Sequence, residues 1–344
     1  MTDELANIEM DLEVTGRPSQ SMKLSEITWV LQEVRRFGET HQLTVDGSPM
    51  HTVFAHPQAA EILRLFHDLW GFVEEPVLTS GVELMSRPNW RELLETLRGL
   101  ETSTLWFSFY GADATHDRAV RRQGAYRKNL DAIEQTRQAG MRTGCNLFVT
   151  TESIPQVDQI VADLQRAGIQ EIIPCLPDFT PDAQGRRNEH LRPNWPEVEN
   201  LPQKLDTIPE TANWRHFWYE LPHKHTEAWY VQQALEGTWP AEPDLRSIWL
   251  VCCPHLDVSR GIAGHYGRRY GNLRRDGVNT VLSRAVADGP YSFDEIWFAQ
   301  EQTLPVQYLA VRFGHADGLR LHNGPGSIRR WWMECARRAS LNAK

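Results

Sequence analysis

The first half of the chain alternates β-strand and α-helix signals, and no other sequence feature restricts the fold as strongly. Residues 8–14 (IEMDLEV) alternate apolar and acidic side chains, which predicts a strand that is buried on one face. Apolar residues at helical spacing then run from Ile27 to Phe37, with Ser25 as the expected N-cap and Gly38 as the residue that ends the helix. A strand followed by a helix is the repeating unit of a parallel α/β fold.

This unit repeats up to about residue 175. Five further strands are expected at residues 42–45, 73–78, 104–110, 142–150 and 171–175. The intervening helices are expected to start near Pro57 and after Pro88 and to span residues 126–139 and 155–167, and residues 111–124 are expected to form a loop. Six strands with right-handed crossovers form either a barrel or a doubly wound sheet, and in both folds the functional face lies at the carboxyl ends of the strands.

The composition changes after about residue 176, because residues 177–210 are rich in Pro, Asn and charge and predict a long irregular connection. Trp and His are frequent in the remainder, which carries a strong strand signal at residues 247–252 and a basic helix at residues 328–338. We therefore expect two domains: a barrel-like domain over residues 1–185 and a Trp- and His-rich α+β extension over residues 186–344.

Charge and cysteine content exclude several classes of protein. The chain has 36 Lys and Arg residues against 45 Asp and Glu residues, a net charge of −9, which argues against nucleic acid or an anionic membrane as the main partner. No apolar stretch reaches the ~18 residues of a membrane span. The five cysteines are odd in number and scattered, which is typical of reduced thiols, and the start of the chain has no signal-peptide pattern. We expect a cytoplasmic protein.

Several segments match the signatures of a known enzyme family in order and spacing. They are LEVTGR at residues 12–17, LSE at 24–26, DGSP at 46–49, the strand, HD…R…G loop and strand at 107–153, and the GNL-plus-helix segment at 270–285. Together they resemble the core of the radical S-adenosylmethionine (radical SAM) enzymes. The resemblance implies an α/β fold with a partial (β/α)6 TIM-like barrel, and its members often modify peptides or natural products.

The loop after the first strand departs from this family. Family members carry a CxxxCxxC motif there, whereas this chain reads Pro18-Ser19-Gln20-Ser21-Met22-Lys23 and has no cysteine. A [4Fe–4S] cluster needs thiolate ligands, three of them from the protein in this family, and the nearest cysteine is Cys145 on the expected fifth strand. We therefore expect no iron–sulfur cluster and no adenosyl-radical chemistry.

The resemblance points to polar residues at the mouth of the barrel as a ligand-binding site. They are Asp46, Ser48, Ser108, Tyr110, His116, Asp117, Arg122 and Asn146. Asp46 stands in the turn that holds the SAM ammonium in the family, where it either supplies a replacement carboxylate or caps its own turn. Asn146 needs a polar partner on a largely apolar strand, either a ligand or a neighbouring backbone group. Bound SAM is compatible with this set, and no catalytic residue is identified.

His116-Asp117 and Arg121-Arg122 match the HD…R loop of the family. Either the arginines bind an anionic group of a substrate, or an Asp–Arg pair orders the loop. Outside the core, His223-Lys224-His225 and the Cys252-Cys253 pair with His255 offer zinc-type ligands. Their spacing matches no closed zinc motif, so no metal site is expected.

Tryptophans are the other unusual feature of the second half. Trp331-Trp332 lies beside Arg329-Arg330 and is an interface candidate, whereas Trp249 is expected in a core.

These observations lead to one expected function and two alternatives. The leading expectation is a radical-SAM-fold protein without the cluster, acting as an accessory or substrate-binding partner in peptide or natural-product biosynthesis. Its partners would be an active radical SAM relative or a substrate peptide, with a small molecule in the barrel mouth. The first alternative is a non-radical enzyme that binds SAM or another small molecule there. The second alternative is a protein that holds a cluster or metal through Cys252, Cys253 and the histidines.

Overall fold

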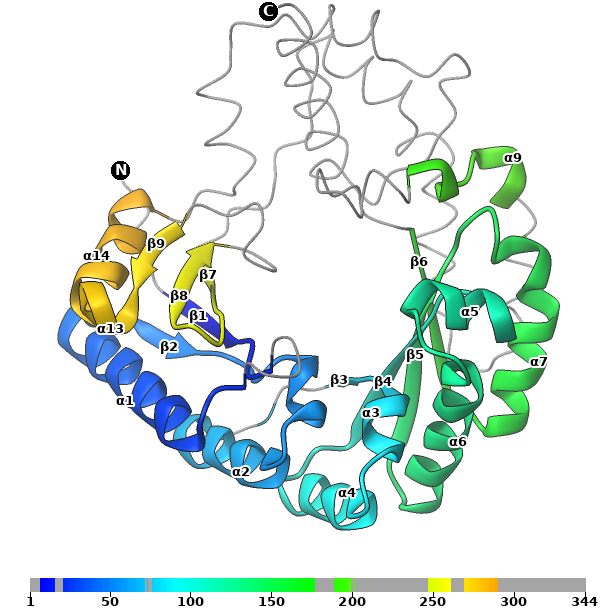
Figure 1. The fold of residues 1–344 in the computed structure, drawn as a ribbon, viewed down its shortest axis with the longest axis horizontal. Coiled ribbons are helices and arrows are strands. Elements are labelled where there is room, and N and C mark those ends of the chain that lie inside the picture. Colours follow the sequence, from blue (N-terminus) through cyan, green and yellow to red (C-terminus); the bar gives the residue numbers. More distant parts are fainter. Residues whose placement is uncertain are drawn as a thin grey trace, which may run out of the picture. The chain divides into compact units, whose positions relative to one another are not determined.

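The computed structural model describes residues 7–15, 21–71, 73, 76–176, 189–198, 201, 247–260 and 269–289 (Figure 1). The chain divides into two compact units. The first comprises residues 1–106, 138–142 and 243–296, and the second comprises residues 107–137, 143–242 and 297–344. The helix expected at 328–338, Trp331-Trp332, His223-Lys224-His225 and most of 177–210 lie outside the described residues.

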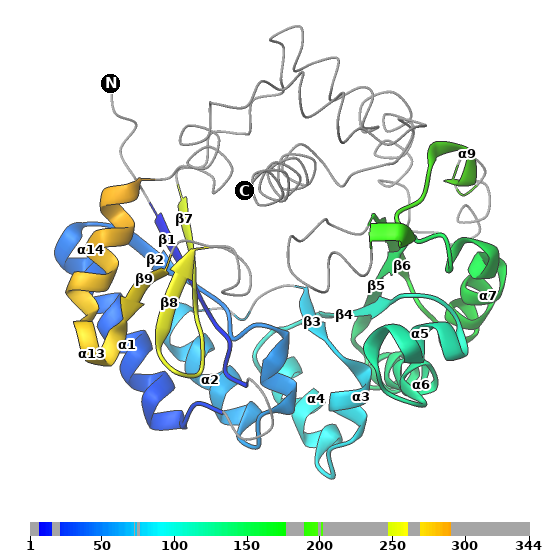
Figure 2. The same ribbon diagram turned by 45° about the horizontal axis from the view of Figure 1, so that its top comes forward.

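The first unit is built on a five-stranded sheet in the order β2-β1-β7-β8-β9. Its strands are β1 (Asn7–Leu12), β2 (Thr44–Asp46), β7 (Ser247–Cys252), β8 (Asp257–Arg260) and β9 (Arg269–Asn272). β1 is parallel to both β2 and β7, whereas the pairs β7-β8 and β8-β9 are antiparallel. The strand predicted at residues 247–252 is confirmed, and it lies beside the first strand of the chain (Figures 1 and 2). The domain boundary between residues 185 and 186 stays a prediction.

β1 buries one face and keeps the other polar, as the alternation in its sequence predicts. Ile8, Met10 and Leu12 are fully buried, while Glu9 on the opposite face is exposed. α1 (Leu24–His41) packs against β1 and β2, and α14 (Val278–Asp288) packs against β9. The two helices contact each other and lie on the same side of the sheet in both views (Figures 1 and 2).

α1 differs from the prediction at both ends. Lys23, not Ser25, is the N-cap residue, and the Glu26 carboxylate accepts the Lys23 backbone N–H at 3.1 Å. Gly38 does not end the helix but is buried inside it, and the left-handed C-cap is Gln42. A Cβ at position 38 would lie 2.3 Å from Cγ2 of Val45, so this glycine is required by the close approach of β2.

The rest of the first unit contains α2 (Ala59–Trp70), β3 (Val77–Thr79) and α4 (Trp90–Gly99), which the sequence pattern predicted. It also contains three short elements that the pattern did not predict: the 3-10 helix η1 (His51–Ala55), α3 (Gly81–Met85) and α13 (Leu273–Asp276). η1 and α3 are too short to show a helical period in the sequence. The helix expected near Pro57 starts at Ala59, because Pro57 belongs to the preceding turn, where its carbonyl accepts an N–H of Arg87.

A second sheet has the order β3-β4-β5-β6, and the division between the units runs through β4 (Thr104–Phe109). The following elements are α5 (Asp113–Val120), α6 (Ala125–Gln138), β5 (Arg142–Phe148), η2 (Ile154–Gln156), α7 (Val157–Ala167), β6 (Glu171–Cys175), η3 (Glu189–Leu191) and α9 (Trp195–Val198). β5 and β6 are parallel, with Asn146 opposite Ile173 and Phe148 opposite Cys175. α6 and α7 cover one face of these strands (Figures 1 and 2).

The expectation of a loop at residues 111–124 was wrong, because α5 lies within it. Only Thr115 and His116 of this helix are buried, so no apolar stripe marks it in the sequence. Its start is held instead by polar contacts: Gln156 Oε1 accepts the Ala112 N–H at 2.7 Å, and Gln156 Nε2 donates to Thr115 Oγ1 at 2.8 Å. Sequence periodicity cannot reveal a helix that is held by a side chain more than forty residues away.

The GNL segment is a structural turn between β9 and α13. Asn272 Oδ1 accepts the backbone N–H groups of Arg274 and Arg275, and Asn272 Nδ2 donates to the His255 carbonyl and to Asp257 Oδ1. Asn272 therefore caps α13 and ties it to the β7-β8 hairpin.

Parallel strands that alternate with helices confirm the mixed α/β class. Within the described ranges, no helix combines the length and apolar character that a bilayer span requires.

Candidate functional site

The predicted site residues fall into two groups, one in each unit, near the carboxyl ends of parallel strands. Asp46 and Ser48 belong to the first unit. Ser108, Tyr110, His116, Asp117, Arg122 and Asn146 belong to the second unit.

In the first unit, a buried carboxylate that the sequence analysis did not single out organises the strand ends. Asp11 is only 6% exposed. Its Oδ1 accepts the Ser48 backbone N–H at 3.0 Å and the Ser48 hydroxyl at 2.9 Å, and its Oδ2 accepts the Trp249 indole N–H at 2.7 Å. Strand β1, the turn after β2 and strand β7 are therefore all joined through this one carboxylate. Trp249 is half-buried and serves this contact.

The DGSP turn lies tightly against β1. A Cβ at Gly47 would lie 2.0 Å from the Met10 carbonyl oxygen, so only glycine fits there. The Leu12 N–H donates to the Ser48 carbonyl at 2.9 Å. The amide, hydroxyl and carbonyl of Ser48 thus all face protein groups, and Ser48 fastens the turn to the sheet.

Asp46 is the half-buried carboxylate of this turn. Burial raises its pKa, and the nearby negative charge of Asp11 adds to this shift, while a side-chain hydrogen bond with Asn7 opposes it. Asp46 thus has a protein partner in Asn7, and the prediction that it contacts a ligand is left open.

Hydrogen bonds join the described residues on either side of the loop after β1. Thr15 forms a β-bridge with Ser21, and the Met22 N–H donates to the Val14 carbonyl at 3.0 Å. His56 Nδ1 accepts the Gln58 N–H at 3.0 Å, so Nε2 carries the proton that is donated to the Met22 carbonyl at 2.8 Å.

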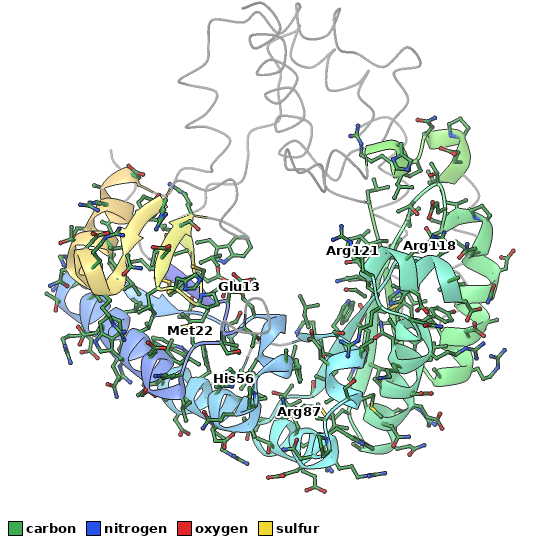
Figure 3. All side chains as sticks on the ribbon, viewed as in Figure 1. Glu13, Met22, His56, Arg87, Arg118 and Arg121 are labelled. Atoms are coloured by element: carbon green, nitrogen blue, oxygen red, sulfur yellow. The ribbon has the colours of Figure 1, made fainter. Side chains whose placement is uncertain are left out.

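Arg87 extends these hydrogen bonds to the next loop. Its guanidinium donates to the carbonyls of Phe54, His56 and Pro57 at 3.1, 2.6 and 2.8 Å. Glu13, Met22, His56 and Arg87 are labelled in Figure 3. Burial lowers the pKa of Arg87, while the nearby Glu61 carboxylate opposes this shift. The Arg87 guanidinium is therefore a partly desolvated cation whose hydrogen bonds go to backbone carbonyls.

The residues around this loop do not fit a [4Fe–4S] cluster. Residues 13–23 contain no cysteine. Cys252 pairs with Leu12 in the sheet and is fully buried, and burial raises the pKa of its thiol well above the ordinary value. A [4Fe–4S] cluster requires several protein thiolates, and the cysteines that belong to the first unit are Cys252 and Cys253, neither of which lies in the loop after β1. In the part of the chain that the structure describes, no three His, Cys, Asp or Glu side chains gather closely enough to hold a metal ion.

In the second unit, the strand ends carry an aromatic stack. Tyr110 follows β4 and Phe148 ends β5, and their rings are parallel within 6° at a centroid distance of 4.4 Å. Both side chains are half-buried. Burial raises the pKa of Tyr110, and nearby Cys175 adds to the shift.

Asn146 lies on the same face, two residues before Phe148. Its Oδ1 accepts the Cys175 thiol at 3.6 Å across the β5-β6 pair. The sequence left a ligand or a backbone group as its partner, and the structure supplies the side chain of a neighbouring strand. Ser108, half-buried on β4, contributes its carbonyl, which accepts Asn129 Nδ2 at 3.1 Å.

Buried His116 hydrogen-bonds the backbone that carries Tyr110. It is only 1% exposed, its Nδ1 accepts the Tyr110 N–H at 3.2 Å, and its Nε2 faces Asn129 Nδ2 at 3.5 Å. Burial lowers the pKa of His116 to about 4, although the neighbouring Asp117 carboxylate opposes the shift. The imidazole is neutral near pH 7 and holds the backbone of the turn that carries Tyr110.

Asp117 orders the HD…R loop through backbone amides. Its Oδ2 accepts the Gly124 N–H at 2.6 Å and its Oδ1 accepts the Tyr126 N–H at 3.0 Å, at the start of α6. Of the two alternatives, loop ordering is the one that the contacts of Asp117 support. Arg122 is exposed, and its N–H donates to the Asp117 carbonyl at 2.9 Å.

Sequence reasoning missed Asp11, His56, Phe148 and Cys175. Phe148 and Cys175 could have been found, because alternation along β5 and β6 places them on the face of Asn146. Asp11 could not, because its role depends on Trp249, 238 residues away.

No protein-family model matches the chain, and no curated protein matches its sequence. Solved structures match its fold. Native anSMEcpe with bound AdoMet gives a TM-score of 0.52 at 12% identity, covering 98% of this chain and 100% of that protein. The same protein with AdoMet and the Kp18Cys peptide gives 0.52 at 12% identity, covering 96% and 98%. SuiB from Streptococcus suis gives only 0.49 at 10% identity, and the match covers 79% of this chain and 64% of the length of SuiB. At these identities the likeness bears on the fold alone.

Proposed function

The chain has the fold of the radical SAM enzymes, and we propose that it is a cluster-free form of that fold. In this proposal it binds a substrate as an accessory partner in peptide or natural-product biosynthesis and does not cleave SAM reductively. The observation that carries the proposal is the loop between β1 and α1, which contains no cysteine. At the end of this loop, His56 hydrogen-bonds the Met22 carbonyl.

The chemistry follows from the missing ligands. Reductive cleavage of a sulfonium needs an electron from a cluster held by thiolates. In this chain the corresponding loop offers Ser, Met and Lys side chains, and the DGSP turn has both Ser48 donors engaged by Asp11. We derive no catalytic step through a cluster.

The strand ends of the second unit support substrate binding. Tyr110 and Phe148 present half-buried aromatic rings, and Asn146 and Cys175 add an amide and a thiol on the same sheet face. Such a mixed surface suits an apolar or planar group with a polar edge. The anSMEcpe structure includes a bound peptide, and we extend peptide binding to this chain as part of the proposal.

Iron analysis tests the cluster-free claim. After anaerobic reconstitution with iron and sulfide, the full chain should hold well under one iron per molecule, whereas one cubane cluster brings about four. A radical SAM enzyme with an intact CxxxCxxC loop, treated in parallel, shows that the procedure works. A stable cluster in this chain contradicts the proposal.

One further measurement tests the proposed partners. An affinity-tagged chain should retain a substrate peptide or a cluster-bearing relative from the same cells, and an empty eluate contradicts the accessory role. We also propose a cytoplasmic location, because the sparse cysteines suit reduced thiols.

The alternative is a non-radical enzyme that binds SAM in the first unit. Asp46 supports it, because a half-buried carboxylate in the DGSP turn is able to accept the SAM ammonium. Calorimetric titration with SAM should then give a heat signal that Asp46→Asn abolishes. Glu9→Gln, an exposed carboxylate on β1, is the matched control. No heat from the unaltered chain eliminates this alternative.

A further inference from the structure

A basic turn lies at the C-terminal end of α5. Residues 118–123 (RAVRRQ), here called the α5 basic turn, are all exposed. Three of them are arginines, and Val120 between them is 39% exposed, one of the few large apolar side chains so open in the described residues. Residues 113–128 carry five basic and two acidic side chains, which reverses the sign of the chain, whose net charge is −9.

Hydrogen bonds order the backbone of this turn, so the backbone positions from which its arginines project are defined. Asp117 accepts the Gly124 and Tyr126 N–H groups, and the Arg122 N–H donates to the Asp117 carbonyl. Arg121 occupies the left-handed region at φ 57° and ends the helix. A fixed backbone reduces the entropy that a partner must overcome on binding.

The arginines are accessible to an incoming anion. The Arg121 side chain makes no ion pair or hydrogen bond within the described part of the chain. Arg118 pairs with Glu152 at 3.3 Å, but the two side chains are 63% and 47% exposed, and a pair this exposed exchanges readily for another carboxylate. Arg118 and Arg121 both lie at the end of α5 (Figure 3).

We propose that the α5 basic turn docks an acidic segment of a peptide. The planar guanidinium group of arginine matches a carboxylate in geometry and charge, and Val120 offers an apolar contact between the arginines of the turn. Nucleic acid fits less well, because it requires a wide basic surface and the chain as a whole is acidic. The inference rests on the proposed function only for the class of partner, a peptide.

Fluorescence anisotropy of the full chain at low salt tests this docking. The probe is a labelled peptide of repeated Glu-Glu-Leu units, compared with a Gln-Gln-Leu peptide of equal length and with a single-stranded oligonucleotide. Arg121→Glu should weaken binding of the acidic peptide about tenfold, because it replaces an attraction by a repulsion. Arg98→Glu, an exposed arginine in the last turn of α4, should change it less than about twofold.

Arg121→Asn provides a second variant, because Asn tolerates the left-handed conformation and removes only the charge. It should weaken binding by a smaller factor than Arg121→Glu. The inference is overturned by equal binding of the Gln peptide, by equal effects of Arg98→Glu and Arg121→Glu, by tighter binding of the oligonucleotide, or by no binding. If the chain takes up iron but its peptide binding still depends on Arg121, only the cluster-free function is refuted. If the chain takes up no iron and its peptide binding does not depend on charge, only the docking surface is refuted.

Discussion

The strand ends of the two units are built from similar βα elements but use their polar groups differently. In the first unit the groups satisfy one another: Asp11 accepts three hydrogen bonds, and both nitrogens of His56 are engaged. In the second unit, buried His116 and half-buried Asp117 accept backbone N–H groups, and half-buried Tyr110 and Phe148 remain at the strand ends. The comparison indicates that polar groups at one set of strand ends are satisfied by one another, whereas at the other set aromatic rings stay partly exposed.

The two regions also differ in charge. β1 carries Glu9 and Asp11 and is followed by Glu13, whereas the end of α5 carries Arg118, Arg121 and Arg122. An anionic partner is therefore favoured at the second and disfavoured at the first.

The largest effect is expected where the first unit is most closed. Asp11→Ala leaves the Ser48 N–H and hydroxyl and the Trp249 N–H without their acceptor, which should lower the free energy of unfolding by about 3–5 kcal/mol. Glu9→Ala, an exposed carboxylate on the same face, should cost less than about 1 kcal/mol. Urea unfolding followed by Trp fluorescence gives both values. An equal loss of unfolding free energy in Asp11→Ala and Glu9→Ala would show that the hydrogen bonds of Asp11 do not stabilise the sheet.

Acidification should affect the second unit through His116. Its pKa is about 4 in the folded chain and 6.5 in the reference state, so between these values the unfolded chain binds the proton and the folded chain does not. Stability should fall by about 3 kcal/mol as the pH drops from about 6.5 to about 4, with no contribution above pH 6.5.

His116→Asn sharpens this test, because an amide oxygen still accepts the Tyr110 N–H but does not titrate. The variant should lose that pH dependence in urea unfolding at a series of pH values. An unchanged slope would assign the effect to other groups.

Arg87 tests the loop closure of the first unit. Arg87→Leu removes the donor to three carbonyls and should cost about 2 kcal/mol. Arg98→Leu is a matched control on an exposed site of α4, with an expected change within about 0.5 kcal/mol. Thermal unfolding of the two variants separates them. If Arg87→Leu leaves the stability unchanged, the hydrogen bonds of Arg87 do not stabilise these loops.

The smallest effect is expected at Asp117. Asp117→Ala removes an acceptor for two N–H groups at the start of α6 and should cost about 1 kcal/mol. Asp117→Asn should recover most of the loss, because its oxygen still accepts one N–H. If Asp117→Ala is neutral, the α5 basic turn is not held by this carboxylate and its preorganisation is refuted.

Local sequence predicted the regular elements well where apolar spacing was clear. β6 is confirmed at residues 171–175, and the alternating burial of β1 follows from its alternating side chains. α5 and the interior Gly38 were mispredicted, because contacts from Gln156 and Val45 determine them.

The sequence by itself determined that no thiolate follows the first strand, because that depends only on which residues are present. It also marked Tyr110 and Asn146 as polar groups near strand ends. Only the tertiary structure decided what those groups contact. Ser48 binds Asp11 instead of standing free, and β7 returns to pair with β1 and bring Trp249 to the same carboxylate. The physical reason is that hydrogen bonds between distant strands depend on register and packing, which local periodicity does not encode.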